Sequence, residues 1–386
     1  MSSGELILGI DLGTSFSTAA CWVKGKLYLV PDRRGEPCVP SIVYFPSRGT
    51  PVVGADAERY RMAEPDATVS GVKRILGKAE GDPELAVFQS HAAVGVQVTP
   101  GGAPVLQTRH GEHTATEVAS LIIRHLKERA ETRFQTRVTR AVMTVPATAD
   151  DATREATRQA ARMAGIEIIR FISEPSAAAI AYNLDAFEGD RRLMVYDFGG
   201  GTFDATILEQ SGGAFKTLAV GGDSCLGGDD FDYALAHQIA SFIYRSQRVD
   251  ITKDVVRWDR IIRQSEATKR ALSAKEMARF RLTDAFSANR ASHDLELNLH
   301  REDVEPKWSE LVERSLKASA QVMVQSRLRP DDVDTTVLVG GSTFIPLIRR
   351  SVQRMMKKPG VVANNPQTAV ACGAAIVATR VASRAA

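Results

Sequence analysis

The chain has 386 residues, 44% hydrophobic and 25% charged, which is long enough for two domains or a duplicated one. Its net charge of +3 does not indicate a nucleic-acid surface, and no apolar run approaches the roughly 18 residues that span a bilayer. Four cysteines without a C-x-x-C pair exclude an obvious disulfide framework or zinc site. Because no signal-like segment opens the chain, we expect a cytoplasmic protein.

The first predicted elements are a strand, a turn and a second strand. Residues 6–13 (LILGIDLG) form an apolar run that ends in Asp-x-Gly, and residues 17–23 continue through Lys24-Gly25 toward a third strand. Residues 46–111 then interrupt this pattern with helical and mixed segments. Apolar residues at helical spacing predict an amphipathic helix over residues 114–134.

A further strand and two helical segments complete the first half. Residues 140–146 (RAVMTVP) predict a strand, and a helical segment over residues 151–165 follows it. Residues 173–182 (SEPSAAAIAY) form a small-residue segment in which Glu174 and Pro175 are typical of a helix start.

The second half repeats these elements in the same order. Residues 193–201 (LMVYDFGGG) match the first strand, residues 335–341 (TTVLVGG) match the strand at 140–146, and residues 365–375 (NPQTAVACGAA) match the SEPSAAAIAY segment. Residues 229–303 interrupt this half as well. Three correspondences in one order predict two similar α/β lobes.

Two glycine-rich turns occupy equivalent places in the repeat. They are Gly13-Thr14-Ser15 and Gly199-Gly200-Gly201-Thr202, each following the aspartate of its first strand. Glycines let backbone N–H groups approach an anion closely, so the pair predicts a phosphate clamp rather than two plain hairpins. Hydrated Mg²⁺ beside Asp11, Asp197 and Asp204 would offset their repulsion from the phosphates. No G-x-x-x-x-G-K-[ST] motif occurs.

The chain resembles a known family from residue 6 to about residue 377, and seven short stretches within that range carry the resemblance. They are GIDLGT (9–14), VKRILG (72–77), SEPSAAAIAY (173–182), DFGGGTFD (197–204), GGDSCLGGDDFD (221–232), the E-x-x-K-x-x-L-S spacing of 266–273, and VGGST (339–343). Asp-x-Gly-Thr alone is shared with actins and sugar kinases, but the full set is specific. The chain resembles the nucleotide-binding domain of the seventy-kilodalton heat-shock (DnaK-type chaperone) family.

The resemblance implies an α/β, actin-like ATPase fold. Two duplicated ribonuclease-H-like lobes would each carry an inserted subdomain, with ATP in the central cleft. Lobe I is expected over residues 1–190 with its insertion at about 40–113. Lobe II is expected over residues 191–386, with its insertion at about 229–310 and a C-terminal helix that returns to lobe I.

The resemblance also implies roles around the phosphates of ATP or ADP, with Mg²⁺ and K⁺. Lys73 would lie beside the γ-phosphate and Thr202 would contact it, while Asp11 and Asp204 would orient water and cations. Glu174 would act on the hydrated magnesium, although a glutamate before Pro175 is equally expected at a helix start. The expected contacts to the nucleotide on this side are Gly13, Thr14, Ser15, Phe16, Lys73, Gly200, Gly201, Thr202 and Gly228, and the expected metal-site residues are Asp11, Asp197, Asp204 and Glu174.

On the adenosine side, two segments from the second lobe match the family. The expected residues are Glu266, Lys269, Arg270 and Ser273 on one segment, and Gly340, Gly341 and Ser342 on the other. Family members commonly carry an arginine against the adenine where this chain has Phe344. An aromatic ring stacks on a base but lacks the cationic head. Gln367 and Thr368 likewise replace two acids, and Gln367 is also expected to line the pocket.

Signalling and partners are expected from the same resemblance. Pro146 and Arg154 match residues that relay nucleotide state, although Arg154 equally fits an exposed helical arginine. A J-domain co-chaperone and a nucleotide-exchange factor are the expected protein partners, with peptide substrates only if a separate peptide-binding domain exists. We expect a monomer that binds neither nucleic acid nor membrane.

Other classes of protein share part of the pattern. VKRILG, GGGTFD and the 266–273 segment disfavour an actin-like filament subunit, and no motif for a second substrate supports a sugar or acetate kinase. The sequence stops at Ala386, before any peptide-binding β-sandwich or helical lid. It therefore leaves open an excised domain, a naturally short protein, and a stand-alone regulatory ATP-binding module.

Overall fold

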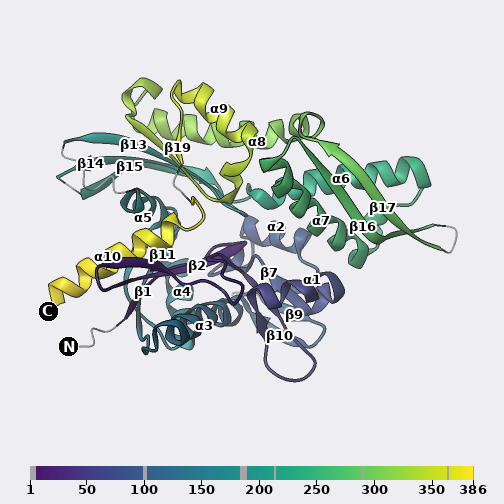
Figure 1. Cartoon of the computed structure of the whole chain (residues 1–386), viewed down its shortest axis with the longest axis horizontal. Coiled ribbons are helices and arrows are strands. Elements are labelled where there is room, and N and C mark those ends of the chain that lie inside the picture. The colour runs from purple at the N-terminus through teal and green to yellow at the C-terminus, as the bar shows by residue number, and fades with distance from the viewer. Residues whose placement is uncertain are drawn as a thin grey trace.

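The structure is a computed structural model that describes residues 6–98, 102–182, 189–212, 214–288, 291–362 and 365–385. Two mixed sheets of matching strand order form its framework, one in each half of the molecule (Figure 1). The first has the order β12-β11-β1-β2-β3, with β4 paired to β2, and the second has the order β15-β14-β13-β18-β19. The predicted mixed α/β class is confirmed.

The strands of the first sheet are β1 (Ile7–Asp11), β2 (Phe16–Val23), β3 (Lys26–Leu29), β4 (Val39–Pro40), β11 (Arg140–Val145) and β12 (Glu167–Ser173). Those of the second are β13 (Arg191–Phe198), β14 (Phe203–Ser211), β15 (Ala214–Asp223), β18 (Thr335–Val339) and β19 (Val361–Val362). In each sheet the first strand pairs antiparallel with the next strand and parallel with a strand from beyond the insertion. Asp11 and Asp197 therefore lie at the same end of equivalent strands.

Helices cover the sheets, and polar side chains fix where several of them begin. The helices are α3 (Ala115–Phe134), α4 (Asp151–Met163) and α5 (Glu174–Ala181) in the first half, and α8 (Arg301–Gln325) and α9 (Pro346–Met356) in the second. Thr114 and Glu117 form a capping box at α3, and the Ser173 hydroxyl accepts a hydrogen bond from a first-turn N–H of α5. Glu174 is therefore the first residue of α5, at the positive end of its dipole.

The last helix, α10 (Ala369–Ala385), packs on the first sheet although it follows the second in sequence. It contacts β1, β2, β11 and α5, and Figure 1 shows it beside β1 and β11 on the side of the molecule where the chain termini lie. Small residues let it approach closely, because Ala371 and Ala375 pack directly on Ala20. We call the part built on the first sheet, together with α10, lobe I, and the part built on the second sheet lobe II.

Each lobe carries an insertion beyond the edge of its sheet (Figure 1). The insertion in lobe I contains β5 (Ile42–Tyr44), β6 (Val52–Val53), η1 (Gly54–Asp56), α1 (Glu58–Ala63), η2 (Pro65–Ala67), β7 (Thr68–Ser70), η3 (Val72–Ile75), α2 (Pro83–His91), β8 (Gly95–Gln97), β9 (Val105–Thr108) and β10 (Gly111–Thr114). The insertion in lobe II contains α6 (Gly228–Gln247), η5 (Ile251–Lys253), α7 (Val255–Ala274), β16 (Met277–Ala288) and β17 (Ala291–His300). Helix α1 contacts α7, so the insertions meet on one side of the space between the lobes.

Short connections complete the described chain, with η6 (Pro330–Asp332) before β18 and η7 (Gly341–Phe344) before α9. All four cysteines are free thiols. No helix in the described ranges is both long and apolar enough to cross a bilayer.

Candidate functional site

A cleft of about 590 Å³ lies between the two lobes. Its walls come from both sheets, both insertions and the start of α10. The residues expected from the sequence that line it are Asp11, Gly13, Thr14, Ser15, Phe16, Lys73, Glu174, Asp197, Gly200, Thr202, Gly228, Glu266, Lys269, Arg270, Ser273, Gly340, Gly341, Ser342, Phe344 and Gln367. Two expected residues do not line it. Asp204 is buried and hydrogen-bonded to Thr202, and Gly201 packs against Thr14 and Arg74.

The two glycine turns meet at the bottom of this cleft. A side chain at Gly200 would collide with the Ser15 hydroxyl of the other lobe, so the glycine permits this approach. The start of α6 holds the second turn, because the N–H groups of Gly228 and Asp229 donate to the carbonyls of Gly199 and Gly200 at 3.0 and 2.8 Å. Both turns therefore present backbone to one volume from opposite sides.

Four carboxyl groups gather beside these turns, and burial makes their negative charge costly. Burial is the largest effect on each aspartate: it raises the pKa of Asp11 to about 6 and that of Asp204 to about 7, and it raises the pKa of Asp197 well above its usual value. The charge of Glu174 acts in the same direction on all three aspartates and contributes to these raised pKa values. The site thus favours a cation or a proton.

Lys73, at the start of η3, supplies one such cation. Its Nζ lies 2.6 Å from Oε1 of Glu174, and both side chains are largely buried. Burial acts to lower the pKa of Lys73, but the charges of Glu174 and Asp11 outweigh it and raise the pKa above its usual value. The ammonium therefore stays charged and faces the cleft from the inserted segment.

The carboxyl groups also fit a hydrated divalent ion. Among the described residues, no three acidic, histidine or cysteine side chains are placed to hold a metal directly. Four carboxyl groups beside the ammonium of Lys73 nevertheless form an anionic donor set, as Mg²⁺ prefers when it retains several of its waters. The arrangement fits Mg²⁺ held through water better than a closed metal cage.

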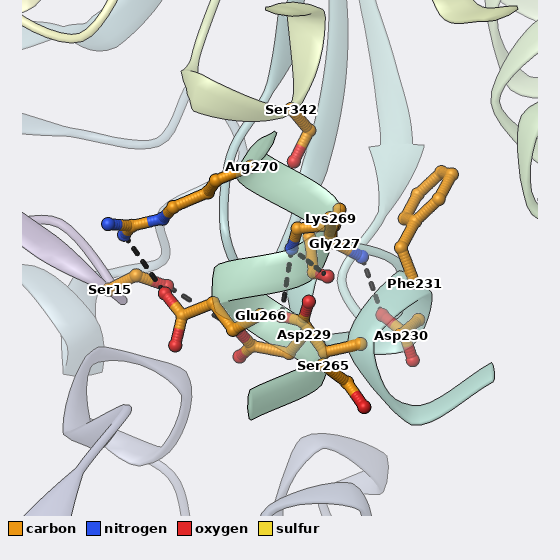
Figure 2. A network of polar contacts seen from close by, with 12 residues as sticks. Ser15, Gly227, Asp229, Asp230, Phe231, Ser265, Glu266, Lys269, Arg270 and Ser342 are labelled. Atoms are coloured by element: carbon orange, nitrogen blue, oxygen red, sulfur yellow. Dashed lines mark hydrogen bonds and ion pairs between the residues drawn. The ribbon is translucent and has the colours of Figure 1, made fainter. Parts of the chain in front are cut away.

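Helix α7 forms one wall of the other half of the cleft. Figure 2 shows three of its residues, Glu266, Lys269 and Arg270, with their polar contacts. Lys269 does not point freely into the cleft, because its Nζ donates to the Gly228 carbonyl at 2.6 Å and to Asp232 at 2.8 Å. Arg270 donates to Glu266 at 2.9 Å and lies over the Phe16 ring, 4.7 Å from its centroid. Lys269 thus fastens α7 to the start of α6, while Arg270 connects the two lobes.

The opposing wall is the turn between β18 and α9. Gly340 has φ of 83°, and a side chain there would also collide with the Phe198 carbonyl, so only glycine suits the position. Ser342 donates to the Gly199 carbonyl at 2.8 Å, which ties this turn to the glycine turn. Phe344 is 39% exposed and lines the cleft together with Gln367.

The structure adds residues that the sequence did not single out. Arg34 and Glu36, on the loop between β3 and β4, line the cleft, and Asp229 at the start of α6 contacts both Ser15 and Arg74 of lobe I at 3.4 Å. In the sequence, the charged run around Arg34 and the GGDDFD stretch were the features from which these residues could have been predicted. Arg154 lies away from the cleft, where its Nε donates to the Ala149 carbonyl at 3.3 Å.

A comparison with protein families matches the family described as Hsp70 protein over residues 7–384. The chain belongs to the Hsp70 family. Hsp70 members are ATPases that bind ATP and ADP, generally with Mg²⁺, and the family implies the actin-like ATPase fold. The match spans both lobes and both insertions, so the matched range includes the residues of every wall of the cleft.

Proposed function

We propose that this chain is an ATP-binding, slowly ATP-hydrolysing switch domain of an Hsp70-type chaperone. The convergence of two equivalent glycine turns, one from each lobe, with Lys73 and the carboxyl groups of Asp11, Asp197 and Glu174 in a single cleft carries this proposal. Backbone N–H groups and an ammonium suit phosphates, while the aromatic and polar walls beyond them suit a nucleoside.

Each group then has a chemical task in hydrolysis to ADP and phosphate. Bound Mg²⁺ would offset phosphate charge, and we expect K⁺ at adjacent carboxyl groups. Lys73 would stabilise the charge that develops on the γ-phosphoryl group, and Thr202 would contact that group. Asp11, whose Oδ1 accepts a hydrogen bond from Thr144 at 2.9 Å, would orient water. Positioning and electrostatics supply most of the catalysis in such phosphoryl transfers.

A nucleotide held by both turns would also report its state to the rest of the molecule. Ser15 and Arg74 of lobe I contact Asp229 of lobe II, so the angle between the lobes and the occupancy of the cleft would be coupled. Hsp70 members generally work with J-domain proteins and nucleotide-exchange factors. We infer that partners of these two kinds would act on this chain by changing that coupling.

The direct test is a single-turnover assay of purified protein with radiolabelled ATP and Mg²⁺, alongside calorimetric titration with ADP. The proposal requires stoichiometric binding and conversion of bound ATP to ADP, however slow. Stoichiometric binding without any hydrolysis would support a regulatory ATP-binding module instead. Absence of both would contradict the proposal.

A further inference from the structure

Phe344, on the wall of the cleft, has a cation packed against its ring. The Arg349 guanidinium lies over its ring, 5.5 Å from the centroid. Phe344 lines the cleft, whereas Arg349 is not among the lining residues. The guanidinium therefore contacts the ring without lining the cleft, and Phe344 remains 39% exposed.

A hydrogen bond fixes this arrangement. Arg349 Nε donates to the Thr343 carbonyl at 2.6 Å, directly beside Phe344. Helical side chains lean toward the N-terminus of their helix, which lets a long side chain in the first turn of α9 reach back over η7. Arg349 forms no ion pair with any carboxylate that the structure describes, so its charge is directed at the ring.

A positive charge at the position of Arg349, in the first turn of α9, is electrostatically unfavourable and needs a compensating interaction. The first turn of a helix favours acidic side chains, yet α9 has no acidic residue there. The next residue, Arg350, is neutralised by Glu305 on α8. Arg349 instead has the Thr343 carbonyl and the π face of Phe344.

We propose that Arg349 and Phe344 form one platform for the nucleotide base, in which Arg349 is the positioning residue. This inference rests on the proposed function and names the residue that holds the Phe344 ring. Arg349 holds the ring in place and draws its π electrons away from the cleft, so an electron-rich purine stacks on the open face. The positive charge of Arg349 thus acts on the base through the Phe344 ring.

The test is a double-mutant cycle on ADP affinity, measured by calorimetry with Mg²⁺. Arg349→Met should weaken ADP binding by roughly 2- to 30-fold, the range expected for a cation–π contact. Arg349→Lys should recover part of the loss, because it restores the charge without the planar group. The effect should fall on KM for ATP more than on kcat.

The second arm shows whether Arg349 acts through the ring. With Phe344→Leu in place, Arg349→Met should have no further effect, since the platform is already gone. Arg350→Met is the control and should bind ADP as the wild type does. Unchanged affinity in Arg349→Met, or an equal loss in both backgrounds, would overturn the inference and leave the proposed function intact. A wild type that binds no ADP would contradict the proposed function itself.

Discussion

Lys73 and Glu174 form a 2.6 Å ion pair that joins the insertion of lobe I to the first residue of α5. The two residues are 101 positions apart, and the pair lies at the edge of the carboxyl cluster. Glu174 is thus the partner of the ammonium that we expect to face the γ-phosphate. Nucleotide binding would then require Lys73 to share its charge between the carboxylate and the phosphate.

Replacing Lys73 should therefore impair hydrolysis more than binding. We expect Lys73→Ala to keep ADP affinity within about tenfold of wild type but to slow single-turnover hydrolysis by at least about 100-fold, because a transition-state charge is lost. Lys78→Ala is a suitable control, since Lys78 pairs with Glu84 and does not line the cleft. A Lys73→Ala protein that hydrolyses ATP at the wild-type rate would remove this residue from the mechanism.

Cation dependence follows from the same cluster. Hydrolysis should require Mg²⁺, because the buried carboxyl groups around Asp197 repel phosphate without it. We also expect faster turnover in K⁺ than in Na⁺. Steady-state assays in matched chloride buffers, with and without EDTA, measure both effects. Equal rates in EDTA and in Mg²⁺ would rule out the proposed metal site.

Asp204 should make the free protein less stable as pH rises. Its pKa is raised from its ordinary value to about 7, mainly by burial, so the folded state binds more protons than the unfolded state between about pH 4 and pH 7. Stability then falls across that window, by up to about 4 kcal/mol. Asp204→Asn should consequently stabilise the protein more at pH 8 than at pH 5.

Thermal unfolding in EDTA at both pH values measures this difference. Asp331→Asn provides the control, because Asp331 lies far out on the surface and pairs only loosely with Lys357. An equal gain from Asp204→Asn at the two pH values would show that the charge of Asp204 does not oppose folding.

The fold class and the position of Asp11 and Asp197 could be predicted because they depend on local pattern. An apolar run that ends in Asp-x-Gly marks the end of a buried strand, and its repetition predicts two equivalent sheets. Side-chain partners could not be predicted in this way. The sequence predicts Lys269 beside the adenosine. Whether its ammonium is free to contact a ligand depends on how α6 packs against α7, and in the structure this packing pairs the ammonium with Asp232.

Phe344 shows the same limit. The sequence shows an aromatic residue where an arginine is expected, and it also shows Arg349 five positions later. Only the tight approach of α9 to η7 brings the guanidinium onto the ring. The positive charge that is missing at position 344 in the sequence is therefore present beside the Phe344 ring in the structure, on Arg349.

Asp229 should slow the release of ADP. Its two carboxylate oxygens contact Ser15 and Arg74 at 3.4 Å, and the Arg74 side chain is only 3% exposed. Without Asp229, Arg74 would keep a buried charge without this partner, and the contact that closes lobe II on lobe I would be lost. The distances are long and Asp229 is partly exposed, so we expect Asp229→Ala to speed ADP dissociation by only about 3- to 30-fold.

Stopped-flow displacement of a fluorescent ADP analogue by excess ADP measures that rate. Asp229→Asn separates charge from hydrogen bonding, because the amide still accepts from Ser15 but no longer attracts Arg74. It should give an intermediate rate. Salt provides an independent check: higher ionic strength should speed release from the wild type more than from Asp229→Ala, since screening weakens only an ionic contact that is present. If Asp229→Ala releases ADP at the wild-type rate, other contacts hold the lobes together, such as the one where Arg270 lies over Phe16.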